Sequence, residues 1–147
     1  MAQFEESLLV GREVEHLVLE QIQTKYPSAV LIKNKFSEYD IFIPENDKKI
    51  EVKLDKKSQF TGNLVVELYM YGKPSGLLRT QADYWYWETG NNLLCIRPIK
   101  IIECLLMNSV PSRTFIGNGD TVEKTACLVK IETIKPYCES ISASLFN

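Results

Sequence analysis

The sequence predicts a mixed α/β (α+β) fold in which a central mixed β-sheet is flanked by helices. Residues 4–25 repeat apolar side chains at helical spacing. Residues 39–54 and 63–71 instead alternate apolar and polar side chains, as half-buried strands do. The chain has 147 residues, of which 45% are hydrophobic and 24% charged, a composition typical of one globular domain. We therefore expect residues 1–147 to form a single domain.

The remaining segments predict further strands, helices and loops of the same α/β fold. Tyr26-Pro27 ends the first helix, because proline cannot continue it. Further strands are expected at 29–32, 84–87, 93–96 and 126–131. Along the aromatic strand 84–87, alternation predicts two rings in the core and two facing outward. Further helices are expected at 79–83, 99–107 (opened by Pro98) and 132–140. The segments 56–62 and 115–120 read as loops.

Residues 40–53 are predicted to form a β-hairpin around the polar turn 44–47. A symmetric turn pairs Asp40 with Glu51 across the two strands. The other pairs are Ile43 with Lys48, Ile41 with Ile50, and Tyr39 with Val52. Because side chains alternate between faces, the apolar face carries Tyr39, Ile41, Ile43, Ile50, Val52 and Leu54. The opposite face carries Asp40, Phe42, Glu51 and Lys53. Two carboxylates directly opposite each other in a sheet repel, which is unfavourable. A divalent cation bound between them would make the arrangement favourable.

Asp40 followed by Glu51-Val52-Lys53 resembles the acid, spacer and Glu-x-Lys motif of the PD-(D/E)xK nuclease superfamily, which has the restriction-endonuclease-like fold. The proline often found before the first acid is Tyr39 here. The pattern Gly11-x-x-x-Glu15 also resembles the first helix of archaeal-type Holliday junction resolvases. Glu15 lies at the border of the apolar stripe of its helix, where a carboxylate needs a partner. A border glutamate that simply reaches solvent is the alternative.

The resemblance implies a catalytic set of Glu15, Asp40, Glu51 and Lys53. Asp40, Glu51 and the main-chain carbonyl of Val52 would bind Mg²⁺, with Mn²⁺ as a substitute, and Glu15 would complete the site. These are the hard oxygen ligands that Mg²⁺ prefers. Lys53 would stabilise the attacked phosphate or position the nucleophile.

Two further segments resemble members of this superfamily. Residues 61–67 look like the Gly-Asn…Glu segment of resolvase-like members, which makes Glu67 a supporting site residue. The run from Ser75-Gly76 to Asp83-Tyr84 resembles a set of phage and bacterial proteins. Hydroxyl groups, a glycine turn and cations suit phosphate contacts. The expected substrate-binding residues are Lys73, Ser75, Arg79 and Thr80. An ordinary loop is the alternative for this run.

Composition excludes several other classes of protein. A single histidine, His16, rules out His-based triads and multi-histidine metal sites. No apolar run approaches the roughly 20 residues of a membrane span, and the N-terminus lacks the features of a signal peptide. The four cysteines have no Cys-x-x-Cys spacing and are expected to be buried thiols in a reducing compartment. We therefore expect a cytoplasmic protein, for which a phage or prokaryotic host is plausible, that makes no membrane contact.

The leading functional prediction is a Mg²⁺-dependent endonuclease that cuts DNA, with branched junctions or other structured DNA as substrates. RNA stays an alternative substrate. A net charge of −2 opposes bulk coating of nucleic acid, but lysines gather around the hairpin, at positions 33, 35, 48, 49, 53, 56 and 57. A junction resolvase would form a homodimer, because two symmetric cuts need two sites. The competing hypotheses are a catalytically silent nucleic-acid-binding domain of the same fold and an unrelated α/β protein with a chance motif.

Overall fold

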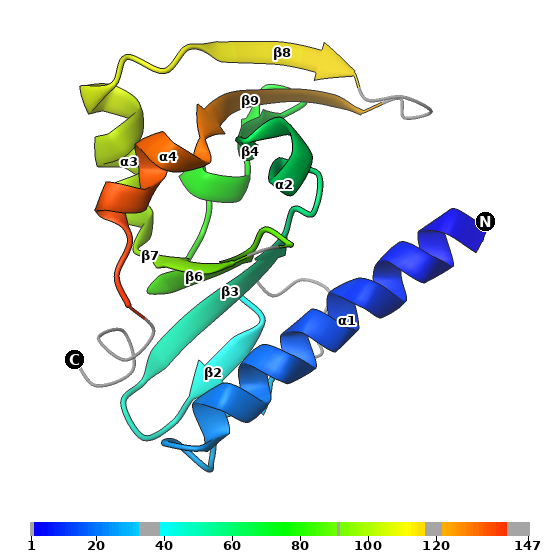
Figure 1. Cartoon of the computed structure of the whole chain (residues 1–147), viewed down its shortest axis with the longest axis vertical. Coiled ribbons are helices and arrows are strands. Elements are labelled where there is room, and N and C mark those ends of the chain that lie inside the picture. Colours follow the sequence, from blue (N-terminus) through cyan, green and yellow to red (C-terminus); the bar gives the residue numbers. More distant parts are fainter. Residues whose placement is uncertain (1, 33–38, 91, 117–121, 141–147) are drawn as a thin grey trace.

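A computed structural model describes residues 2–32, 39–90, 92–116 and 122–140, with side chains from residue 12 onward. It is a mixed α/β structure with a central mixed sheet and helices (Figure 1). The helices are α1 (Ala2–Gln23), α2 (Ser58–Thr61), η1 (Gly76–Leu78), α3 (Pro98–Met107), α4 (Ile131–Ile134) and η2 (Lys135–Tyr137). The strands are β1 (Val30–Leu31), β2 (Ile41–Ile43), β3 (Lys48–Leu54), β4 (Asn63–Met70), β5 (Lys73–Pro74), β6 (Tyr84–Glu88), β7 (Leu93–Ile96), β8 (Ser112–Ile116) and β9 (Glu123–Lys130).

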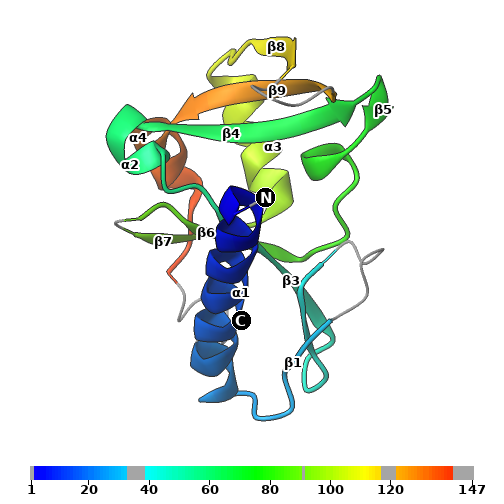
Figure 2. The same ribbon diagram turned by 90° about the vertical axis from the view of Figure 1, so that its right-hand side faces the viewer.

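The described strands form two sheets. The first has the order β1-β2-β3-β6-β7 and the second the order β5-β4-β9-β8. In the first sheet β3 runs parallel to β6, while its other neighbouring pairs are antiparallel. The helix α1 crosses the first sheet, and its N-terminal half extends beyond it (Figures 1 and 2). The second sheet lies at the other end of the molecule.

Each face of the first sheet packs on its own apolar cluster. On one face α1 contributes Val18 and Ile22 to a cluster with Ile41, Ile50 and Tyr86. On the opposite face the two tryptophans of β6 pack with the second sheet and with α3 and α4. Members of this second cluster include Trp85, Trp87, Leu64, Val66, Val129, Ile101 and Ile134. The sheet is therefore covered on both sides.

This double cover corrects the prediction for the aromatic run 84–87. Alternation predicted two rings in the core and two outside, but all four are buried, with exposed fractions of 3%, 2%, 0% and 2%. Tyr84 and Tyr86 face the α1 side, and Trp85 and Trp87 face the second sheet. A strand buried on both faces carries apolar side chains at every position, so alternation gave the wrong result here.

The strand predicted at 63–71 is confirmed as β4, but it does not belong to the sheet that carries Asp40. The edge of β3 that β4 would need is occupied by β6. Between β3 and β4 the chain makes the helical turn α2, which ends at Gly62 with a φ of 74°. That turn sends the chain into the second sheet, where β4 pairs with β5 and β9.

Of the other predicted helices, strands and loops, some are confirmed and some are wrong. The hairpin of β2 and β3, the helix α3 and the hairpin of β6 and β7 are confirmed. The helix predicted at 79–83 is wrong: the 3₁₀ turn η1 precedes it, its last hydrogen bonds reach the Arg79 and Thr80 amides, and residues 80–83 form no helix. The segments 56–62 and 115–120, predicted as loops, contain α2 and the end of β8. The helix predicted at 132–140 is the shorter pair α4 and η2.

Some predictions concern residues outside the described chain or groups that the fold buries. Lys33, Lys35 and residues 117–120 lie outside the described residues. Cys95, Cys104 and Cys127 are buried thiols outside any disulfide, as expected, while Cys138 is half-buried. None of the described helices combines the length and the apolar composition needed to cross a bilayer.

Candidate functional site

Asp40 lies directly before β2, where the regular pairing of β2 with β3 stops. The ladder confirms the pairs of Ile43 with Lys48 and of Ile41 with Ile50. It does not continue to a pair of Asp40 with Glu51, so that part of the predicted register is wrong. Instead the Asp40 amide donates to the Ile50 carbonyl at 2.8 Å, and Asp40 Oδ2 accepts a 2.7 Å hydrogen bond from the Val52 amide. The carboxylate thus occupies the position of a missing strand neighbour.

This displacement brings Asp40 towards two other carboxylates. The side chains of Glu51, on β3, and of Glu15, on α1, each come within hydrogen-bonding reach of the Asp40 carboxyl. The three acids come from three separate segments of the chain. The structure therefore brings together the acidic residues of the predicted catalytic set.

Lys53 lies beside these acids on the same face of β3 as Glu51. Its Nζ is 3.7 Å from Glu51 Oε1 and 4.9 Å from the centre of the Trp85 ring. In the parallel pairing of β3 with β6, Glu51 stands next to Trp85 and Lys53 next to Trp87. The ammonium group of Lys53 lies over the Trp85 ring in a cation–π contact. This contact keeps the ammonium group near the acids.

Burial and like charge both act on the two glutamates. Burial, with the neighbouring Asp40 adding to it and Lys53 opposing it, raises the pKa of Glu51 from 4.5 to about 8. Burial and Asp40 also raise the pKa of Glu15. Near neutral pH Glu51 therefore holds a proton, which its hydrogen bond with Asp40 can share. A divalent cation at this position would favour the ionised forms instead.

The donor set fits a hard divalent cation in part. The Val52 amide points to the edge of β3 where Asp40 lies, and in an extended strand the carbonyl of the same residue points to the same side. Asp40, Glu51 and the Val52 carbonyl thus present hard oxygen atoms at one place. Among the described residues, no group of three or more His, Cys, Asp or Glu side chains is arranged to hold a metal ion. Mg²⁺ commonly uses one or two carboxylates and keeps several waters, so the carboxylates would supply only part of its coordination.

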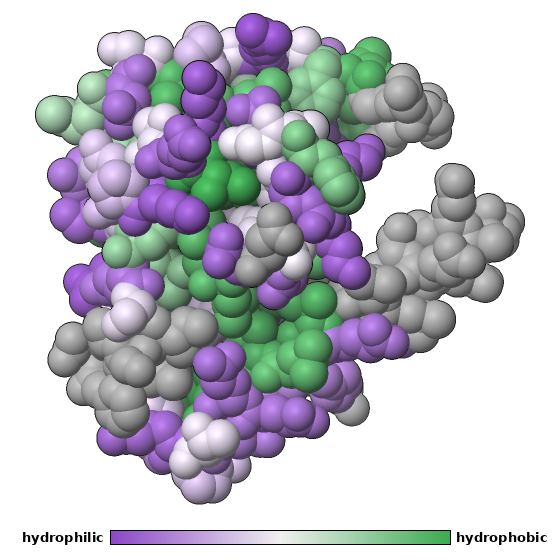
Figure 3. Space-filling model, in the orientation of Figure 1, coloured by the Kyte–Doolittle hydropathy of each residue, from purple (hydrophilic) through white to green (hydrophobic). Residues whose placement is uncertain are grey.

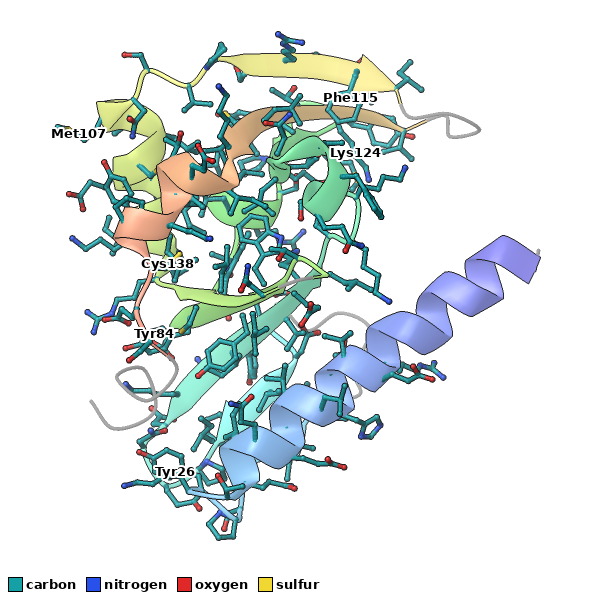
Figure 4. All side chains as sticks on the ribbon, viewed as in Figure 1. Tyr26, Tyr84, Met107, Phe115, Lys124 and Cys138 are labelled. Atoms are coloured by element: carbon teal, nitrogen blue, oxygen red, sulfur yellow. The ribbon has the colours of Figure 1, made fainter. Side chains whose placement is uncertain are left out.

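A cleft of about 230 Å³ opens beside Lys53, between β3 and the second sheet. Glu67 lines it from β4, although the prediction had placed Glu67 in the same sheet as Asp40. Two residues of this region were missed by the sequence reasoning. Asp55 follows Glu51 and Lys53 at strand spacing, which could have revealed it. Lys124, whose Nζ is 3.6 Å from Glu67 Oε1, comes from β9 (Figure 4), and only the strand pairing shows it.

The predicted substrate-binding residues have different environments. Lys73 and Arg79 are exposed. The Ser75 hydroxyl is buried, with no hydrogen-bond partner among the described residues. Thr80 Oγ1 accepts hydrogen bonds from the Ala82 amide at 3.2 Å and from Trp85 Nε1 at 3.0 Å. Thr80 thus fixes the ring beneath Lys53, while the side chain of Lys73 is exposed to solvent.

Comparisons of the chain with protein-family models, with curated proteins and with solved structures give no match. The geometry of the site is therefore what indicates a function for this chain.

Proposed function

We propose that this chain has a restriction-endonuclease-like core, belongs to the PD-(D/E)xK superfamily and acts as a Mg²⁺-dependent endonuclease on DNA. The observation that carries the proposal is the convergence of Glu15 and Glu51 on Asp40, with the Lys53 ammonium held beside Glu51. The order of elements also supports it: an N-terminal helix, an antiparallel hairpin with the acids and the lysine, and a following parallel strand.

Each residue of the site has its own role in the proposed phosphodiester hydrolysis. A bound Mg²⁺ would supply a more acidic water and neutralise charge on the phosphate. Asp40, Glu51 and the Val52 carbonyl would hold the ion. Glu15 orients the attacking water through its contact with Asp40. Lys53 donates to a phosphate oxygen, where it stabilises the negative charge that develops in the transition state.

A catalytically silent nucleic-acid-binding domain of the same fold is the second candidate. One observation favours it: the described residues offer no arrangement of three side-chain ligands for a metal. Such a domain would bind DNA with its lysines and leave the phosphodiester intact.

Cleavage of a labelled four-way junction and of a linear duplex, in Mg²⁺ and in EDTA, separates the two candidates. An Asp40→Asn protein tests the site. Asp47→Asn is its matched control, because Asp47 lies in the hairpin turn with a φ of 58°, a conformation that asparagine also adopts. The nuclease proposal expects Mg²⁺-dependent cutting that Asp40→Asn loses and Asp47→Asn keeps. Binding of both DNAs without cutting would establish the silent domain.

Junction specificity and self-association are separate parts of the proposal. Faster cutting of the junction than of the duplex supports a resolvase, while equal cutting retains the active site and discards the specificity. Sedimentation of the protein alone tests the homodimer that two symmetric cuts require.

A further inference from the structure

The short helix α2 holds the most exposed large apolar side chain in the part of the chain whose side chains are described. Phe60 is 85% exposed, more than Leu106 at 74% or Met107 at 73%. Single apolar residues on a surface are common, so exposure alone indicates nothing. The setting of Phe60 makes it informative.

The turn that carries Phe60 is fixed on several sides. The buried Ser58 hydroxyl donates to the main-chain carbonyl of Asp55. The Gly62 amide closes the turn by donating to the Ser58 carbonyl at 2.7 Å, and the Gly62 carbonyl accepts from the Ile131 amide at 2.9 Å. Phe60 is therefore held in solvent by an anchored turn, not by a frayed chain end.

Two exposed lysines share the face of the turn with the ring. The amide of Phe60 donates to the Lys57 carbonyl at 3.0 Å, so residues 56–60 follow a helical path. Side chains three and four positions apart on a helix are neighbours, which places Lys57 and Lys56 beside Phe60. Hydrophilic and apolar residues lie side by side in the region of α2 on the face of the molecule shown in Figure 3. An exposed apolar ring on the same turn as two exposed lysines matches a ligand that is anionic and has an exposed flat face.

The distance from this ring to the candidate site is limited by the chain itself. Lys53 and Phe60 are joined by three residues that span about 10 Å at full extension and by four residues of helix that rise about 6 Å. The Cα atoms of Lys53 and Phe60 therefore lie within about 16 Å of each other. Bases along one strand are about 3.4 Å apart, so this distance covers about five nucleotides.

We propose that Phe60 stacks on an unpaired or unstacked base of a discontinuous DNA, with Lys56 and Lys57 on the adjoining phosphates. This proposal rests on the proposed function and names its substrate class: DNA with a branch, gap or flap within about five nucleotides of the cut. Continuous duplex buries both faces of every base, so it offers the ring no partner. Stacking of a base on an aromatic side chain stabilises binding about 5- to 150-fold.

Binding in EDTA tests the proposal without any cutting. Wild type, Phe60→Ala, Phe60→Leu and Phe60→Tyr are titrated with a labelled four-way junction, a gapped duplex and a continuous duplex. The expected result is a 5- to 150-fold loss of affinity for the first two DNAs in Phe60→Ala and Phe60→Leu, with Phe60→Tyr close to wild type. Binding of the continuous duplex stays unchanged in all three variants.

Met107→Ala is the matched control, because Met107 is also apolar and largely exposed but lies on α3, away from α1 (Figure 4). Equal losses on the junction and the continuous duplex, full binding by Phe60→Leu, or an equal loss in Met107→Ala would each overturn the proposal. A Phe60→Ala protein that dissociates from a self-assembled form would instead assign the ring to a protein contact and also overturn it. Junction binding that needs Phe60 in a protein that cuts no DNA would refute the nuclease and leave the stacking intact.

Discussion

Replacing Glu51 by glutamine is expected to stabilise the metal-free protein at alkaline pH. The folded pKa of Glu51 is about 8, against 4.5 for an ordinary glutamate. Between these values the unfolded chain has lost the proton and the folded chain retains it, so stability falls as the pH rises. This fall begins above pH 4.5 and is complete above pH 8. Glutamine has no carboxyl proton to lose, so the Glu51→Gln protein does not undergo this loss of stability.

The size of the effect follows from the same two pKa values. Each pH unit of difference corresponds to about 1.4 kcal/mol, so by pH 8 ionisation of Glu51 destabilises the folded state by about 4 kcal/mol. In a protein of this length that is roughly 8 to 16 °C in thermal midpoint. Added Mg²⁺ should raise the midpoint of wild type at pH 8, because the ion binds the carboxylate, and should raise that of Glu51→Gln much less.

Urea and thermal unfolding at pH 5 and pH 8, in EDTA and in Mg²⁺, measure these differences. Glu103→Gln is the control, since Glu103 lies in a surface ion pair with Lys100 on α3. The stability difference between Glu51→Gln and wild type should widen from pH 5 to pH 8 in EDTA, and the control should show no such widening. A constant difference, or a Glu51→Gln protein that is less stable than wild type at pH 8, would refute the reasoning about the buried acids.

Four further substitutions test the site and its supports. Glu15→Gln should slow Mg²⁺-dependent cutting about 10-fold or more in single-turnover assays while the protein stays folded; an unchanged rate would remove Glu15 from the site. Gly76→Ala should destabilise by more than about 3 kcal/mol in urea, because its φ is 49° and a Cβ there would lie 2.5 Å from a main-chain oxygen of β4. Gly62→Ala, with a φ of 74° and open space, should lose only about 1 kcal/mol. Asp83→Ala removes the acceptor of the 2.8 Å hydrogen bond from the Lys49 amide and should lose about 1–2 kcal/mol, whereas no loss would mean that water replaces the carboxylate.

The hairpin of the candidate site could be predicted because its information is local. Apolar alternation and a four-residue turn determine which residues of β2 and β3 share a face, and the pairs near the turn are confirmed. Farther from the turn the same symmetry fails at Asp40, whose side chain takes the place of a strand neighbour for the Val52 amide. A side chain that replaces a main-chain partner leaves no trace in the pattern of apolar residues.

The second sheet could not be predicted for a different reason. The alternation in β4 identifies a strand and its buried face but not its partners, which are the distant β9 and the short β5. The tryptophans of β6 illustrate the same limit. Their burial depends on the second sheet and α3 covering a face that alternation alone assigns to solvent. Lys124 enters the surroundings of the site only through this long-range pairing.

Cleavage of a labelled four-way junction by Lys53→Met in saturating Mg²⁺ tests the central claim most directly. Lys100→Met is its control, because Lys100 is an exposed lysine whose ion pair with Glu103 lies on α3. If the Lys53 ammonium stabilises the phosphate in the transition state, Lys53→Met cuts about 100-fold more slowly than wild type, and Lys100→Met cuts at the wild-type rate. A Lys53→Met protein that folds, binds the junction and cuts it as fast as wild type would contradict the assignment of this site to phosphodiester hydrolysis.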